Sequence, residues 1–269
     1  MDLVIPKTIH YCWFGKNPLN DEAIRCIESW KKYFPDYQIV RWDESNFDFS
    51  KCDYAKEAYE SKKWAFVSDY ARFKILYEHG GIYFDTDVEV IKSFDDILEN
   101  GPFFGKERSP ESFKMIGPGL GMAAFPKMKF YEEIVDYYEK IHYNIEQNIT
   151  IVDHVTKLFQ EHGYKGDNEI EVISGFTLYP VEYFCPRDYL TGALFLTDNS
   201  RSIHLYSATW LTEKERKFMD FEHKLYKKVK LNSHNCFLVK VAMFLYCYGV
   251  INCTKKFIKK ILKKIRRNI

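Results

Sequence analysis

Residues 80–90, which read GGIYFDTDVEV, constrain the fold more than any other stretch of this chain. Gly80 and Gly81 are typical of a helix end, and the apolar residues that follow predict a buried strand. Alternate side chains of a strand share a face, so Asp85 and Asp87 are expected to point the same way, roughly 7 Å apart. Two carboxylates at a strand end suit a hard divalent cation bound together with the phosphates of a ligand. A solvated turn without a ligand is the alternative for such a motif taken alone.

The segments around this stretch predict one α/β domain. A strand at 7–15, a helix capped by Asn20 or Asp21 that ends near Tyr33, and a strand at 37–43 predict a parallel unit. Residues 107–121 lack periodicity and are rich in Gly and Pro, which is typical of a binding loop or lid. The remaining elements are expected as two helices over 53–79, broken near 61–63, helices at 94–99, 128–143 and 151–162, and strands at 102–105, 121–125, 171–174 and 201–206.

The second helix of 53–79 carries an acid on its apolar face. Asp69 falls at helical spacing among apolar residues such as Phe66, Phe73 and Leu76. Burying a carboxylate is costly unless it has a partner, and Arg72 lies three residues on, near enough to share that face. Two interpretations stay open: an intrahelical ion pair that anchors the helix, or a pair that contacts a ligand.

Residues 204–210, HLYSATW, end the last expected strand. His204 could be a third metal ligand, Ser207 could hydrogen bond a phosphate, and Trp210 could donate through its indole N–H. A histidine beside apolar residues is also common in protein cores, so this group is less specific than the two aspartates.

The cysteines and the N-terminal residues indicate a cytoplasmic protein. The seven cysteines are odd in number and form no Cys-x-x-Cys pair, which favours reduced thiols. The first residues, MDLVIPK, lack the basic and apolar regions of a secretion signal.

Residues 233–269 are expected to form a tail after a catalytic domain at 1–232. Residues 236–253 form an apolar run interrupted by Lys240, and residues 255–267 carry eight of the 39 basic residues of the chain and no acid. The apolar residues of 255–267 recur at helical spacing, which favours an amphipathic helix lying on an anionic membrane surface. A membrane span over 236–253 is the alternative, but it would place the basic residues against the positive-inside tendency. A nucleic-acid-binding arm is disfavoured because the rest of the chain carries an acidic excess.

Four motifs, in this order, resemble the DXD-containing sugar-binding glycosyltransferases of family 32. The motifs are PKTIHYCWFG at 6–15, SDYAR at 68–72, GGIYFDTD at 80–87 and HLYSATW at 204–210. That family includes capsule and surface-polysaccharide transferases of bacteria, yeast mannosyltransferases and, more distantly, the glucosylating domains of large clostridial toxins. The resemblance spans about residues 5–211 and implies a GT-A fold, an α/β fold with a Rossmann-like, mostly parallel sheet flanked by helices. The C-terminal helical tail would follow this fold.

The resemblance also implies a role for each motif residue. In the donor site, Trp13 would border the nucleobase, Asp69 and Arg72 would hold the sugar and ribose, and Tyr83 would line the nucleotide pocket. Asp85 would contact the ribose and, through water, a Mn²⁺ or Mg²⁺ ion, which Asp87 and His204 would bind directly. Ser207 would lie near the donor, and Arg72 and Trp210 would stabilise the departing phosphate. Relatives often have a Ser-Trp dipeptide where this chain has Ser207 and Trp210 separated by two residues.

The expected function is therefore a retaining, metal-dependent transfer of a hexose from a nucleotide-sugar, with a UDP-sugar favoured. The acceptor would be a glycan on a lipid carrier in surface polysaccharide synthesis, at the inner face of the cell membrane. Two alternatives stay open. A phosphatase of the aspartyl-phosphate type would use Asp85 as its nucleophile, but Glu89 close behind would repel a phosphate substrate. A non-catalytic membrane-bound scaffold gains nothing from clustered carboxylates that repel one another without a metal.

Overall fold

The computed structural model describes residues 4–107, 114–144, 150–189, 191–207 and 219. The chain divides into two units, residues 1–188 with 194–210 and residues 189–193 with 211–269. The expected tail at 233–269 and Trp210 lie outside the described residues, so the predicted boundary at 232 stays a prediction.

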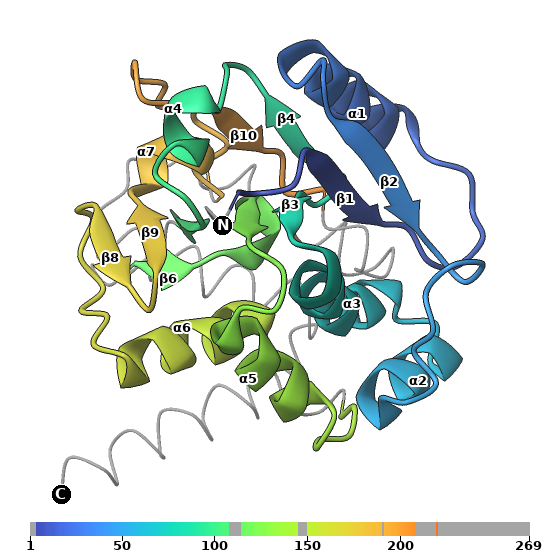
Figure 1. Ribbon diagram of the computed structural model, residues 1–269. Helices are drawn as coiled ribbons and strands as arrows, with labels where there is room; N and C mark the ends of the chain where they lie inside the picture. Colours follow the sequence, from blue (N-terminus) through green and yellow to red (C-terminus); the bar gives the residue numbers. More distant parts are fainter. Residues whose placement is uncertain (1–3, 108–113, 145–149, 190, 208–218, 220–269) are drawn as a thin grey trace, which may run out of the picture. The chain divides into compact units, whose positions relative to one another are not determined.

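An eight-stranded sheet runs through the first unit (Figure 1). Strands β2, β1, β3, β5 and β9 run in one direction, while β7, β8 and β6 run the opposite way. The expected α/β fold class, with a mostly parallel sheet, is thus confirmed. In spatial order the strands are β2 (Gln38–Trp42), β1 (Thr8–Cys12), β3 (Gly81–Tyr83), β7 (Met122–Ala124), β5 (Phe103–Glu107), β9 (Phe176–Tyr179) and β8 (Glu171–Ile173), with β6 (Met115–Ile116) paired to β5.

A second, two-stranded sheet pairs β4 (Val88–Val90) with β10 (Ser202–His204) in antiparallel fashion. The prediction of one continuous strand through 80–90 is therefore wrong. The chain leaves the large sheet after Tyr83 and turns, with the Val88 N–H donating to the Asp85 carbonyl at 3.1 Å. Asp85 and Asp87 consequently lie in a turn between two sheets and not on one face of a strand.

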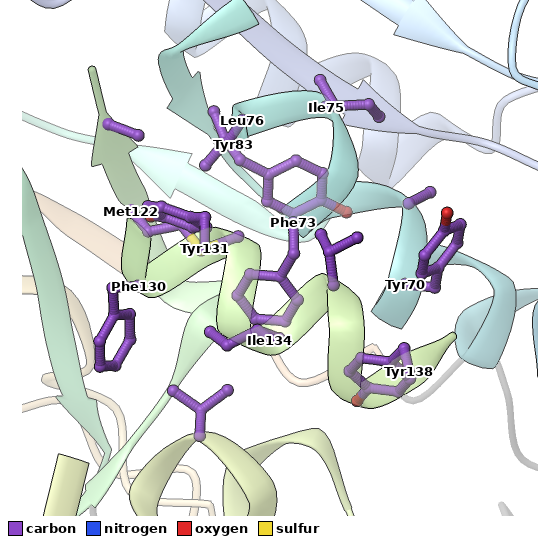
Figure 2. Packing of buried hydrophobic residues seen from close by; sticks show 14 of the residues in the cluster. Tyr70, Phe73, Ile75, Leu76, Tyr83, Met122, Phe130, Tyr131, Ile134 and Tyr138 are labelled. Carbon is purple, nitrogen blue, oxygen red and sulfur yellow. The ribbon is translucent and has the colours of Figure 1, made fainter. Parts of the chain in front are cut away.

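Helices cover both faces of the large sheet. Neighbouring residues of a strand point to opposite faces, so Tyr83 packs with α3 and α5 in one cluster and Ile82 packs with α1 and α7 in another. Figure 2 shows the first cluster, where Phe73 of α3 lies against Tyr131 and Tyr138 of α5. The helices are α1 (Asp21–Tyr33), α2 (Asp53–Glu60), α3 (Trp64–His79), α4 (Asp95–Leu98), α5 (Lys129–Tyr138), α6 (Ile151–Glu161) and α7 (Val181–Phe184), with a 3-10 turn at Pro118–Leu120.

Two helix ends follow the local sequence signals that predicted them. The Asn20 side chain accepts a hydrogen bond from the Ala23 N–H at 2.8 Å, as expected for an N-cap. Helix α3 ends at Gly80, whose φ of 64° a glycine adopts freely and whose N–H bonds to the Leu76 carbonyl. Helix α5 ends at Tyr138, short of the expected residue 143, because the Tyr143 N–H donates to Glu57 of α2 instead of continuing the helix.

The part of the chain described contains no helix long and apolar enough to cross a membrane. The described cysteines, Cys12, Cys26, Cys52 and Cys185, are all buried.

Candidate active site

The topology gathers the predicted site residues at one edge of the large sheet. Strands β1 and β3 are parallel neighbours, with His10 paired to Tyr83. Trp13 follows the end of β1, and Asp85 follows the end of β3 at the same edge. His204 ends β10, where it pairs with Val88, the residue after Asp87. The two sheets therefore meet at the turn that carries both aspartates.

One set of contacts, the arginine group, is centred on Arg72. Its guanidinium donates to Asp69 at 3.0 Å and to Asp85 at 3.1 Å. The Tyr83 hydroxyl donates to the other oxygen of Asp85 at 2.9 Å. Because Asp69 and Arg72 lie one turn apart on α3, the helix holds both on one face beside the end of β3. The intrahelical ion pair predicted from the sequence is present, and it extends to the DXD motif.

Burial governs the protonation of the arginine group. It raises the pKa of Asp69 to about 7, against the opposing effect of the Arg72 charge. The pKa of Arg72 is raised further despite burial, because Asp85 and neighbouring groups favour its charged form. Arg72, whose side chain is only 5% exposed, thus carries a permanent positive charge toward Asp85.

A second set of contacts, the histidine group, holds Asp87. The Nε2 atom of His204 lies 3.3 Å from Asp87 Oδ1, and the Ser207 N–H donates to Asp87 Oδ2 at 2.9 Å. Burial opposes both charges, but the mutual attraction lowers the pKa of Asp87 to about 2 and raises that of His204 to about 9. The pair is therefore ionised at neutral pH, with a titratable cation beside Asp87.

Three further residues at this edge were not predicted as site residues. Glu107 ends β5, and its pKa is raised by burial and by the nearby charges of Asp85 and Asp87. The Gly119 carbonyl accepts from the Asp85 N–H, and the Ser207 hydroxyl donates to Glu22 of α1. Glu107 and Gly119 belong to 107–121, which the sequence marked as a binding loop, although 115–120 forms a short strand and a 3-10 turn.

The structure says less about the two tryptophans expected at the donor site than about the other expected site residues. The Trp13 indole donates to the Asn17 carbonyl at 2.8 Å, and no hydrogen bond or ring contact within the described residues joins it to the arginine or histidine group. Trp210 lies outside the described residues.

The donor chemistry of this edge fits a hard divalent cation in part. Among the described residues no group of three His, Cys, Asp or Glu side chains is arranged to hold a metal ion, because Asp85 is turned toward Arg72. Asp87 and His204 are already in contact, and the Nδ1 atom of His204 is buried and finds no hydrogen-bond partner among the residues that the structure describes. Two carboxylates and an imidazole are ligand types found with Mn²⁺ and, for the oxygens, Mg²⁺.

The stretch that matches a known protein family contains the arginine group and both aspartates of the turn. Residues 20–104 match a family described as the glycosyltransferase sugar-binding region containing the DXD motif. Inositol phosphoceramide mannosyltransferase 3 of Schizosaccharomyces pombe is 34% identical over 110 residues, which cover 39% of this chain and 30% of that protein. Inositol phosphoceramide mannosyltransferase 1 of the same yeast is 26% identical over 150 residues, 52% of this chain and 44% of that protein. The matched stretches thus span less than half of these relatives.

Two solved structures were also compared. The PaToxG glycosyltransferase is 22% identical with a TM-score of 0.43, over 58% of this chain and 70% of that one. A glycosyltransferase involved in glycosylation of the major capsid of PBCV-1 is 10% identical with a TM-score of 0.42, over 79% and 98% of the two chains.

Proposed function

We propose that this chain, whose residues 20–104 match the DXD-containing sugar-binding region of glycosyltransferases, transfers a hexose from a nucleotide-sugar to a glycan acceptor. The transfer proposed is metal-dependent and retains the anomeric configuration. The observation that carries the proposal is the turn at 85–87, where the two aspartates of the motif face the arginine group and the histidine group at one sheet edge. A nucleoside diphosphate is a poor leaving group until its charge is neutralised, and this edge gathers ionised acids and two cations.

The proposed metal site consists of Asp87 and His204, with Asp85 acting through water. A bound Mn²⁺ or Mg²⁺ would act as a Lewis acid on the diphosphate. His204 must lose its proton to serve as a ligand, so a divalent cation would take over the charge balance that the proton provides in the ion pair with Asp87. The buried, unpartnered Nδ1 atom supports a ligand near this ring.

The proposed donor site is built by the arginine group together with Trp13. Arg72 spends three N–H groups on Ser68, Asp69 and Asp85, which leaves two of its five for a ligand. Those two could hold the sugar and stabilise charge on the departing phosphate, while Asp85 reaches the ribose and Tyr83 lines the nucleotide pocket. In the proposed site Trp13 would border the base, and Ser207 and Trp210 would serve the diphosphate. A same-face displacement, in which the leaving phosphate assists the acceptor hydroxyl, is the proposed mechanism.

The names of the two yeast relatives suggest candidates for the transferred sugar and for the acceptor. Both yeast relatives are named as mannosyltransferases, so mannose joins the hexoses of UDP-sugars as a candidate. Both names include inositol phosphoceramide, a lipid, which supports a lipid-linked saccharide as the acceptor in surface polysaccharide synthesis.

Calorimetric titration of UDP- and GDP-sugars tests the proposal. The panel is run with and without Mn²⁺ on the full chain, on Asp87→Asn and on Asp36→Asn, an exposed acid used as a matched control. We expect one donor to bind in a way that requires both Mn²⁺ and Asp87, with the control unchanged. If no nucleotide binds under any condition, the non-catalytic scaffold becomes the better interpretation. Phosphate release from a generic ester that depends on Asp85 would favour the phosphatase.

We further propose that residues 236–269 attach the enzyme to an anionic membrane surface at the cytoplasmic face. The support is the charge pattern alone: an apolar run followed by eight basic residues without an acid. Each basic residue near such a surface contributes about 1 kcal/mol. Replacing Lys259, Lys260, Lys263 and Lys264 with Gln in the full chain should abolish sedimentation with vesicles that contain phosphatidylserine and leave donor binding intact. Unchanged sedimentation would refute membrane attachment through these charges.

A further inference from the structure

A pocket of about 340 Å³ lies between α4, β8, β9 and α7. None of its lining residues belongs to the arginine group or the histidine group. Its floor includes the buried residues Thr177, Tyr179 and Ile97, and the exposed side chains of Ile170 and Val172 stand at its rim. Its volume is that of a small-molecule site, which combines an apolar lining with a few placed polar groups.

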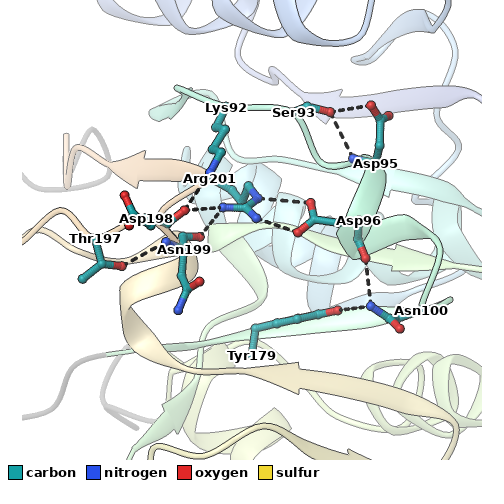
Figure 3. A network of polar contacts seen from close by, with 10 residues as sticks. All are labelled: Lys92, Ser93, Asp95, Asp96, Asn100, Tyr179, Thr197, Asp198, Asn199 and Arg201. Atoms are coloured by element: carbon teal, nitrogen blue, oxygen red, sulfur yellow. Dashed lines mark hydrogen bonds and ion pairs between the residues drawn. The ribbon is translucent and has the colours of Figure 1, made fainter.

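The polar groups of this pocket have unused hydrogen-bonding capacity. The Asn100 amide nitrogen donates to the Asp96 carbonyl at 2.8 Å and to the Tyr179 hydroxyl at 3.2 Å (Figure 3). Among the described residues the Tyr179 hydroxyl only accepts, so its own proton can donate to a ligand, and the Asn100 side-chain oxygen can accept. The Thr177 and Tyr183 hydroxyls make no side-chain hydrogen bond within the described residues. The pocket thus offers both donors and acceptors, as a hydroxyl-rich ligand requires.

The charges around the pocket favour a neutral ligand. None of the described Lys or Arg side chains lines it, so a phosphate or carboxylate would find no cationic partner among them. The one charged lining group, Asp96, is paired through both oxygens with Arg201, at 3.2 and 2.5 Å (Figure 3). A nucleotide or an anionic lipid headgroup is therefore disfavoured.

Two tyrosine rings provide an apolar surface beside these polar groups. The rings of Tyr179 and Tyr183 lie 4.9 Å apart, tilted by 45°. A pyranose ring has apolar C–H faces and a rim of hydroxyls, so it can pack on tyrosine and hydrogen bond at its edge. We propose that this pocket binds one neutral sugar unit of the acceptor glycan, a role that rests on the proposed transferase function.

The pocket is connected to the acidic turn through Arg201. The Arg201 side chain also donates to the carbonyls of Asp198 and Asn199, which fixes the start of β10 (Figure 3). Three residues of extended chain, about 10 Å, lead from Arg201 to His204. The strand that ends at His204 therefore begins beside the pocket.

Saturation-transfer NMR of the full chain with a panel of neutral disaccharides, containing mannose, glucose or galactose, tests this assignment. Thr177→Val and Tyr183→Phe each remove one hydroxyl at nearly constant shape. Each should weaken binding about threefold to tenfold, as expected for one lost hydrogen bond. Asn199→Ala, on the adjacent loop but not in the pocket lining, is the matched control and should bind like the wild type.

The outcomes separate this assignment from the transferase proposal. Asp87→Asn should lose donor binding but keep disaccharide binding. Disaccharide binding without any donor binding would refute the transferase and leave a saccharide pocket. Failure of every disaccharide to bind, or binding that the two pocket variants leave unchanged, would overturn the pocket assignment.

Discussion

Asp85 and Asp87 lie one residue apart in the sequence, but the fold gives them different cations. Asp85 faces Arg72, a guanidinium that keeps its charge at every accessible pH and is held by α3. Asp87 faces His204, an imidazolium whose pKa is raised to about 9 and which sits on the small sheet. The Asp85 side chain is 29% exposed and that of Asp87 is 16% exposed, and each carboxylate is satisfied by its cation.

The difference assigns different tasks to the two aspartates. A permanent cation cannot be exchanged, so the arginine group fixes the turn and presents Asp85 in one orientation. The cation beside Asp87 can be lost as a proton, so that position can take a metal ion in exchange. We therefore expect changes in the arginine group to lower both stability and rate, and changes in the histidine group to act mainly on metal-dependent binding and rate.

The largest effect is expected from Arg72→Met. It leaves Asp69 and Asp85 without their cation, and breaking a buried ion pair from one side costs about 3–5 kcal/mol. Urea unfolding measures the loss, and Lys31→Met, which breaks an exposed pair with Glu28, should cost under about 1 kcal/mol. The double variant Arg72→Met with Asp69→Asn should regain part of the loss. A single-variant loss no larger than that of the Lys31 control would contradict the structural role of the arginine group.

Asp87→Asn should lower kcat about 100-fold, because it removes the charge that would hold a cation at the developing negative charge. The folded state should be destabilised less than in Arg72→Met, since His204 can release its proton once its partner is neutral. Rate measurements across a Mn²⁺ titration, paired with urea unfolding, check both statements. A variant that kept its Mn²⁺ dependence would exclude Asp87 as a ligand.

The stability of the fold is expected to depend on pH through His10, which contacts Gly80 just before β3, the strand that precedes both aspartates. The Nδ1 atom of buried His10 accepts from the Trp42 indole, so its Nε2–H donates to the Gly80 carbonyl at 3.1 Å and the ring is neutral. Burial lowers the pKa of His10 to about 4 from 6.5, so the unfolded state takes up a proton at a higher pH than the folded state does. The contribution of neutral His10 to the stability of the fold is therefore complete above pH 6.5 and is lost as the pH falls toward 4. Between about pH 7.5 and pH 5 the loss is about 2 kcal/mol.

Urea midpoints at the two pH values measure this effect in the wild type and in His10→Gln, which should lack it. His142 is a control of opposite sign. The hydrogen bond with Glu57 raises the pKa of His142, so the contribution of this residue to stability is lost as the pH rises. Equal pH slopes in the wild type and His10→Gln would show that His10 is not the titrating group.

The smallest effect is expected from Gly119→Ala. A Cβ atom there would lie 2.1 Å from Asp85 Oδ2, so Asp85 must move away from its position against Arg72. We expect a rate loss of about tenfold, because a small displacement of a reacting constellation is costly. Gly163→Ala is the comparison: its φ of 99° strains an added side chain, but no atom lies within 4 Å of the Cβ position. Activity loss in both variants would point to general destabilisation.

Much of the site could be read from local sequence, because its signals are local. The spacing of Asp69 and Arg72 indicated their ion pair. Asn20 and Gly80 indicated where two helices begin and end. The strand, helix and strand patterns of residues 7–43 indicated the parallel pairing of β1 with β2. Glu107 was not found, since a single acid at the end of a strand carries no pattern of its own. The strand break at 84–87 was not found either, because an apolar run followed by Val88 and Val90 reads as one strand.

The sequence by itself determined which residues could do chemistry here. They are two acids one residue apart, an acid and an arginine one helical turn apart, and a histidine, His204, in the last expected strand. Only the tertiary structure decided how they are paired. Arg72 meets Asp85 because α3 packs beside β3, and His204 meets Asp87 because β10 pairs with β4 from a distant part of the chain. Such contacts depend on the packing of whole elements, which local propensity and spacing do not encode.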